Sequence, residues 1–179
     1  LSRQMHPHRG SLDAFERWIQ PYVEAYKQAL RDGYRAPILT IPTVFHVITD
    51  GSSPTNISAA QVQAQLDQLN LDFRNLAGST NPAAADVEVE FCLASLDPSG
   101  NVMLEPGINR VTTYGAGAFT DTYVDGTIKP GTIWSPTDYL NVWSANLSGG
   151  LLGWAQFPDA SGLAGMPTNG GNANTDGVV

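Results

Sequence analysis

The sequence predicts a mixed α/β domain: a twisted sheet of about five strands with one backing helix, preceded by a separate helical segment. Short runs rich in apolar and β-branched residues occur at 41–49, 87–96 and 139–147, as in strands buried within a sheet. Apolar residues spaced by three and four occur before and after the first run and indicate two amphipathic helices. A strand, a helix and a strand in succession predict a right-handed crossover, so the first two strands are expected to pair in parallel.

This pattern divides the chain into a helical segment with a connector at 1–37 and a sheet domain at 38–179. Ser11 is expected to cap the first helix, and Gly33 is expected to end it. The connector that follows carries prolines and is expected to be extended, with Arg35 exposed in it.

The clearest helix start in the sheet domain is Ser58, because Gln61 is placed to complete a capping box. Gly78 is expected to end that helix. The remaining segments are expected to be strands at 108–113, 139–147 and 151–157, a Gly- and Thr-rich surface excursion at 114–134, and the start of a further strand at 178–179.

Composition excludes some classes of function. The 179 residues hold 9 Lys and Arg against 17 Asp and Glu, a formal charge of -8, so a nucleic-acid partner is not expected. No apolar run has the length of about 20 residues that a membrane span needs. The charged fraction is low at 15%, with abundant Gly, Thr and Asn, which favours a secreted, extracellular bacterial protein.

Two kinds of histidine are candidates for chemistry. His6 and His8 alternate near the N-terminus, but two ligands make a poor metal site, and solvated side chains are the favoured interpretation. His46 lies in an apolar strand, where a buried, hydrogen-bonded structural histidine is favoured over a catalytic one.

The other candidates also have simpler structural interpretations. Glu88 and Glu90 share one face of a strand, and a solvated face is favoured over an acid–base pair. Cys92 is flanked by apolar residues and is expected to be a buried thiol or to be bridged outside the chain. The run at 170–177 is similar to a calcium-binding nonapeptide, but a single copy favours a loop. Three tryptophans are expected in the core rather than on a sugar-binding platform: Trp134, Trp143 and Trp154.

The sequence contains no HExxH motif, no Gly-rich phosphate loop and no nucleophile elbow. The residues by themselves therefore assemble no catalytic set and no metal site.

The order of the segments along the chain identifies a family more specifically than any single segment does. The segments are IPTVFHVITDG, NISAAQVQAQLDQLNLDFRNL, DVEVEFCLAS, GINRV, TIWSPTDYLNVWSANLSGGLLGWAQFP and TDGVV. Together they resemble the N-terminal subdomain of the pappalysin family of zinc metallopeptidases, which are metzincins, in its ulilysin-like bacterial branch. The likeness covers residues 38–179 and is most specific at 139–158.

The resemblance implies a metzincin-like upper subdomain and a zinc-dependent endopeptidase. In the family, DGVV leads to a helix with HExxHxxGxxH, which supplies the zinc ligands and the general base. These 179 residues do not include that helix, so the chain is expected to be a truncated catalytic domain that is inactive alone. The implied zinc would be bound by residues beyond this chain, and the implied partners are a peptide or protein substrate and the missing C-terminal half.

The resemblance also implies roles for particular residues. The segment after Ser148 looks like the antiparallel edge strand on the upper rim of the cleft, which pairs with an extended substrate. The expected substrate contacts are Leu151, Leu152, Gly153, Trp154 and Ala155, with an interior strand as the alternative.

Residues 1–37 resemble a helical prosegment that keeps the enzyme latent, and Arg35 is the hypothetical activation site. No Cys precedes Cys92, so a cysteine switch is not expected; His6, His8 or Asp13 would have to substitute, or latency would be steric. A second hypothesis is a non-catalytic extracellular binding or adhesion module on the same sheet.

Overall fold

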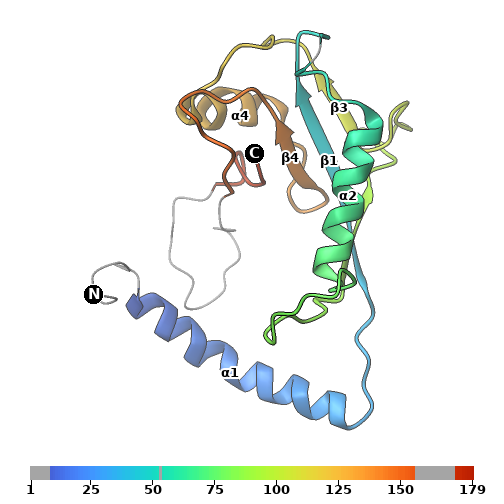
Figure 1. The fold of residues 1–179 in the computed structure, drawn as a ribbon, viewed down its shortest axis with the longest axis vertical. Helices are drawn as coiled ribbons and strands as arrows, with labels where there is room; N and C mark the ends of the chain where they lie inside the picture. The colour runs from blue at the N-terminus through green and yellow to red at the C-terminus, as the bar shows by residue number, and fades with distance from the viewer. Residues whose placement is uncertain (1–8, 53, 156–171) are drawn as a thin grey trace. The chain divides into compact units, whose positions relative to one another are not determined.

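The computed structural model describes residues 9–52, 54–155 and 172–179. The chain divides into two compact units, with a boundary between Pro37 and Ile38. The first unit contains helix α1 (Arg9–Arg31), and the second contains the sheet and the remaining helices (Figure 1). Among the described helices, none combines the length and the apolar character that a membrane crossing requires.

Helix α1 ends as the sequence predicts, but its start differs. Gly33 has φ +91°, and the Tyr34 N–H donates to the Ala29 carbonyl at 2.9 Å, so a glycine in the left-handed region terminates the helix. The described part of the helix already begins at Arg9, so Ser11 lies inside it and is not its N-cap. The expectation for Ser11 was wrong because the helical conformation extends into the more polar residues before it.

The sheet is parallel and is centred on β1 (Leu39–Ile48). The first half of β1 pairs with β2 (Val89–Leu93) and the second half with β3 (Ile108–Val111), while β4 (Leu140–Ser144) pairs with the middle of β1. The parallel pairing of the first two strands is confirmed. Residues 43–49, in and just after β1, are buried, which explains why this segment reads as an almost continuous apolar run.

Two further segments extend the sheet beyond β4 through isolated bridges. Val178 pairs in parallel with Val142 of β4, and Ala155 pairs antiparallel with Val178. The described residues thus form four strands and two bridged segments, compared with the expected sheet of about five strands. The order of the segments brings Ala155 next to the C-terminal residues of the chain, although they are more than twenty positions apart in the sequence.

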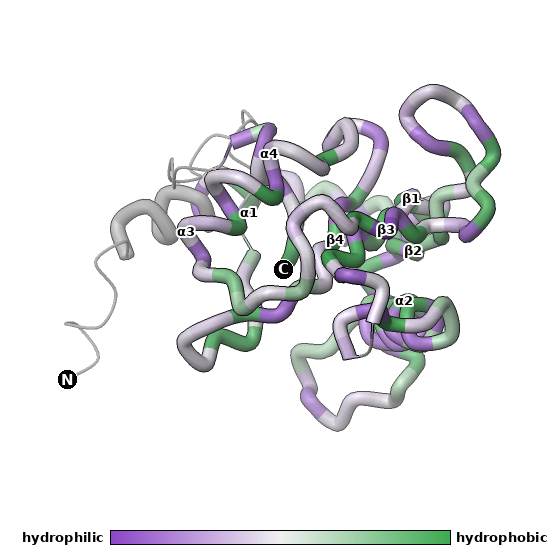
Figure 2. The backbone as a smooth tube through the Cα atoms, turned by 90° about the horizontal axis from the view of Figure 1, so that it is seen from above, coloured by the Kyte–Doolittle hydropathy of each residue, from purple (hydrophilic) through white to green (hydrophobic). Residues whose placement is uncertain are grey.

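Helix α2 (Ala59–Phe73) covers one face of the sheet (Figure 1). Its predicted capping box is confirmed: the Ser58 hydroxyl accepts from the Gln61 N–H, and the Gln61 side chain accepts from the Ser58 N–H at 2.9 Å. Val62 and Leu66 are buried against Phe45 of β1 and join the core on this face. Figure 2 shows hydrophobic segments in the strands, with α2 alongside them.

A continuous helical segment lies on the opposite face, where the sequence predicted a surface excursion. It consists of α3 (Asp121–Tyr123), the π-helical η2 (Val124–Ile128) and α4 (Lys129–Thr132). Thr120 caps it, and two of its apolar side chains are buried with Ile48 and Trp143. The expectation of an irregular loop was wrong because Gly and Pro residues weaken the local helical pattern, whereas packing on the sheet stabilises the helix.

Candidate functional site

Among the described residues, the sheet has an open edge at residues 151–155. The Trp154 N–H donates to the Val179 carbonyl at 3.2 Å, and the Val179 N–H donates to the Trp154 carbonyl at 2.8 Å. Because alternate residues of a strand direct their backbone groups to opposite sides, Gly153 and Ala155 direct theirs away from Val179. Neither residue makes a backbone hydrogen bond to another described residue in this direction. In the part of the chain that the structure describes, these outward donors and acceptors therefore have no backbone partner.

The residues on this edge differ in their exposure. Leu152 is fully exposed (100%), Leu151 is exposed, and Trp154 is half-buried. A Cβ on Gly153 would collide with the Val179 carbonyl oxygen, so a glycine is required for the two segments to approach each other. Of the five predicted contact residues, Trp154 is thus anchored to Val179 and Ala155 is bridged to Val178. The contact of this segment with a substrate stays a prediction.

The edge of β2 is closed instead. The side-chain amide of Asn70 on α2 donates to the Phe91 carbonyl at 2.9 Å, and its oxygen accepts from the Phe91 N–H at 2.7 Å. This amide occupies the backbone groups that a further strand would use, a common protection for a strand edge. Strand addition is therefore blocked at Phe91, whereas no described residue pairs with the outward backbone groups of Gly153 and Ala155.

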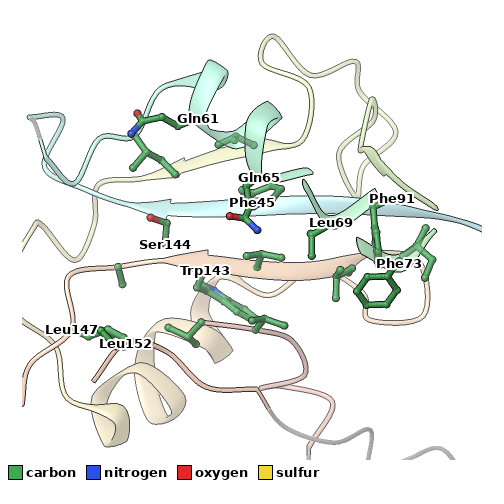
Figure 3. Close-up of a pocket in the computed structure, with 18 of the residues that line it drawn as sticks. Phe45, Gln61, Gln65, Leu69, Phe73, Phe91, Trp143, Ser144, Leu147 and Leu152 are labelled. Carbon is green, nitrogen blue, oxygen red and sulfur yellow. The ribbon is translucent and has the colours of Figure 1, made fainter. Parts of the chain in front are cut away.

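An apolar groove of about 820 Å³ lies beside α2 on the sheet. Its wall on α2 includes Leu69 and Phe73, and its floor includes Phe45 and Val142. Leu147 and Leu152, labelled in Figure 3, also line the groove. The groove also contains Val178 and Val179, so it reaches the bridged segment next to the open edge.

His46 is confirmed as a buried structural histidine. Its Nε2 lies 2.9 Å from the Asn141 Oδ1, and Asn109 donates to its Nδ1 at 3.0 Å, so both ring nitrogens of the neutral form are satisfied. Burial lowers the pKa of His46 to about 4, opposed by the Asn141 hydrogen bond. The ring also stacks on Trp143 at 5.1 Å between centroids. His46 is thus a neutral core residue and has no free nitrogen for catalysis.

Three polar residues in this region were not predicted from the sequence: Asp125, Lys129 and Asn141. Asn141 accepts from His46 and also binds the backbone of Trp134 in both directions, at 2.9 and 3.0 Å. Lys129 is fully buried and lies 2.8 Å from Asp125. The i, i+4 spacing of Asp125 and Lys129 was the available signal, but it requires a helix that the local sequence does not indicate.

The tryptophans and the acidic residues near β2 make structural contacts, in line with the structural interpretations favoured from the sequence. Trp143 is buried, and Trp134 packs edge to face on Tyr139, with ring centroids 5.1 Å apart. Glu90 forms an ion pair with Arg74, which also binds Asp86 at 2.9 Å. A paired acid–base role for Glu88 and Glu90 therefore has no support in the geometry.

The possible metal ligands give no site. His6 and His8 lie outside the described residues, as does the side chain of Asp13. Within the part of the chain that the structure describes, no three His, Cys, Asp or Glu side chains come together to hold a metal ion. The described part of the 170–177 run likewise gives no support for calcium. Cys92 is half-buried with a free thiol.

Arg35 lies after the end of α1, in the segment that leads to β1. It is exposed, has no regular secondary structure and donates to the Tyr34 carbonyl at 2.8 Å. Its assignment as an activation site stays a prediction.

The parallel sheet, the covering helix and the antiparallel edge support a metallopeptidase-related domain with a metzincin-like fold, which the solved structures of mirolysin share. Mature mirolysin of Tannerella forsythia, in complex with a cleaved peptide, is 34% identical, with a TM-score of 0.64 over 80% of this chain and 53% of that chain. Mirolysin in complex with compound 9 is 34% identical, with a TM-score of 0.61 over 80% and 52%.

The pro form is similar as well. A point mutant of Tannerella forsythia promirolysin is 30% identical, with a TM-score of 0.62 over 91% of this chain and 55% of that chain. The chain thus spans about half the length of the structures that it matches. Neither the family models nor the curated proteins give a match to it.

Proposed function

We propose that this chain is the N-terminal part of a secreted, zinc-dependent endopeptidase of the pappalysin family. In this proposal residues 151–155 form the upper rim of the substrate cleft, and residues 1–37 form a latency prosegment. The peptide lies along the rim in an extended conformation and pairs with the outward backbone groups of Gly153 and Ala155.

The open edge is the observation that carries the proposal. Main-chain pairing needs an edge with free N–H and C=O groups. Beside Trp154 these groups have no backbone partner among the described residues, whereas Asn70 occupies them at Phe91. The mirolysin structure with a cleaved peptide supports a peptide as the ligand. Main-chain pairing tolerates many substrate sequences, because the contacts do not depend on the substrate side chains.

The described residues do not fit a zinc ion, and the sequence contains no HExxH motif. We therefore assign the zinc and the general base to a helix that follows Val179 in the full-length protein. These 179 residues alone are not expected to hydrolyse a peptide. The apolar groove beside α2 is the proposed contact surface for that C-terminal half, because it adjoins Val178 and Val179.

The latency role is supported by the pro form. The matched share of this chain is 91% with promirolysin and 80% with mature mirolysin, so the pro form accounts for more of the chain. Exposure of Arg35 beyond the end of α1 is compatible with activation by cleavage there. N-terminal sequencing of the active protein tests this assignment: retention of residues before Gly33 would exclude it.

The coding sequence beyond Val179 gives the first test. The proposal requires HExxHxxGxxH there, and the full-length protein should then cleave casein in a chelator-sensitive manner. A coding sequence without the motif would overturn the peptidase proposal and favour the binding or adhesion module.

Ala155→Pro in the full-length protein tests the rim. Proline removes one outward N–H, and solvent-facing edge positions accept it. Ala155→Ser, which keeps the N–H, is the matched control. We expect Ala155→Pro to lower kcat/KM for a peptide about tenfold, the value of roughly one lost hydrogen bond, and Ala155→Ser to have little effect. Equal activity of both variants would contradict main-chain pairing at this position.

A further inference from the structure

We infer that Lys129 is a positioning residue: its ammonium, held between two tryptophan rings, fixes Trp154 and through it the backbone of the open edge at residues 151–155. The role in peptide binding rests on the function proposed above. The anchoring of the edge is a property of the fold and is measurable separately.

The surroundings of Lys129 are unusual for a lysine. The residue is fully buried (0% exposed), and its Nζ lies 2.8 Å from Asp125 Oδ1. The same Nζ is 5.3 Å from the ring centroid of Trp143 and 5.3 Å from that of Trp154. Among the described residues it makes no hydrogen bond of regular geometry. One carboxylate and two aromatic faces therefore compensate for the loss of hydration.

Asp125 connects the ammonium to the edge. Its Oδ1 approaches Lys129 Nζ and also accepts from Trp154 Nε1 at 3.2 Å. The Trp154 ring is thus held at its face by the cation and at its nitrogen by the carboxylate. Removal of the cation would take away the first interaction and leave Asp125 partly buried without a counter-charge.

The second ring is fixed independently. Trp143 is 2% exposed, stacks on His46, and donates from Nε1 to Thr132 Oγ1 at 2.8 Å. Lys129 therefore holds the half-buried Trp154 ring at a fixed place relative to the rigid Trp143 ring of the core. Because Trp154 makes both backbone hydrogen bonds to Val179, the position of its ring sets where the edge lies along its neighbour.

The need to fill space in the core does not explain why residue 129 is a charged lysine. An unbranched apolar side chain such as Met would occupy a similar volume, and replacement of a buried ion by such a residue is frequently tolerated. A neutral side chain would fill the space without attracting the Trp154 ring to one place. The positive charge of Lys129 thus fixes the position of the edge at residues 151–155.

The test compares Lys129→Met and Lys129→Arg in the full-length protein, with Asp67→Asn as the control. Asp67 is an exposed residue of α2 in the sheet domain, and its carboxylate accepts from the Gln63 side chain at 2.8 Å. Amide hydrogen exchange is measured at Trp154 and Val179, and at Val44 and Val47 of β1 as the internal reference. Peptide cleavage is measured as separate kcat and KM values.

We expect Lys129→Met to accelerate exchange at Trp154 and Val179 about tenfold, with β1 unchanged. KM should rise about tenfold while kcat stays within about twofold, because the edge binds substrate and holds no catalytic group. Lys129→Arg retains the cation and should recover part of both effects, and Asp67→Asn should match the unmodified protein.

Unchanged exchange at Trp154 and Val179, or equal acceleration in β1, would overturn the inference, because the lysine would then be dispensable or only generally stabilising. Faster exchange confined to the edge, with an unchanged KM, would support the anchoring of the edge by Lys129 but would overturn its proposed role in substrate binding. If Lys129→Met does not fold, Asp125→Asn decides: it keeps an oxygen for Trp154 Nε1 but removes the counter-charge, and the same edge-selective acceleration is expected.

Discussion

His46 is a polar residue whose burial is made possible by two amide side chains. Asn141 and Asn109 satisfy the two ring nitrogens, and Trp143 covers one ring face. A second proton on the ring would face the Asn109 amino group, which is itself a donor. Burial and this arrangement of donors favour the neutral imidazole.

The stability of the sheet domain should therefore depend on pH through His46. The pKa is 6.5 in the unfolded chain and about 4 in the folded one, so only the unfolded state takes up the proton between these values. Stability contributed by the neutral ring is complete above pH 6.5 and declines as the pH falls toward 4, by roughly 3 kcal/mol. Urea denaturation between pH 7 and pH 4 measures this change.

His46→Gln is the control for this titration. It removes the titrating group, so the decline between pH 6.5 and 4 should become shallower, although the variant is less stable at pH 7. Asp86 and Glu105 add to the decline near pH 4, because hydrogen bonds from Arg74 and Arg110 lower the pKa of these carboxyls in the folded state. Their contribution is the same in both proteins and cancels in the comparison. An unchanged slope in His46→Gln would contradict the assignment.

At the scale of elements, the helices on the two faces of the sheet differ in how well their local sequences predict them. Helix α2 has a capping box and regular apolar spacing, so its local sequence and its packing agree. The helical segment at 121–132 has Gly126, Pro130 and Gly131 within it and contains a π-helical stretch. Its burial against Ile48 and Trp143 stabilises it despite these residues.

Asn70 on α2 connects a helix to the edge of a strand, and its replacement should affect both. Asn70→Ala removes two hydrogen bonds to Phe91, and we expect a loss of roughly 1–3 kcal/mol in unfolding free energy. Self-association of the exposed β2 edge should increase, measured by light scattering together with urea denaturation.

Asn70→Asp separates the two bonds. A carboxylate still accepts from the Phe91 N–H but repels the carbonyl, so stability should fall without full exposure of the edge. Full stability and no association in Asn70→Ala would show that the amide does not protect β2.

At the scale of the whole molecule, the apolar groove beside α2 remains open among the described residues. It contains the fully exposed Leu152. An apolar surface of this kind marks an interaction site or a liability to aggregate. The isolated chain should therefore bind a hydrophobic dye or associate, and addition of the C-terminal half should suppress the signal.

Two exposed leucines make a matched comparison for this prediction. Leu152 lines the groove, whereas Leu104 is equally exposed and does not line it. Leu152→Ser should lower dye fluorescence more than Leu104→Ser does. A monomeric chain that unfolds cooperatively without dye binding would instead indicate a complete domain.

Residue order and local pattern determined much of this protein: the strands near 41–49, 87–96, 108–113 and 139–147, the capped helix at Ser58, and the parallel pairing of the first two strands. These features follow from apolar spacing, capping chemistry and crossover handedness, which act over short separations. The burial of His46 as a structural, hydrogen-bonded residue also followed from its apolar neighbours.

Only the tertiary structure brought together Trp154, Val179 and the Lys129–Asp125 pair, and only it closed the β2 edge with Asn70. These contacts join residues far apart in the chain, and a helix with Gly and Pro inside it forms through packing on a sheet that is already present. Local sequence patterns do not indicate which distant residues will be in contact. The anchoring of the open edge therefore depends on the tertiary structure.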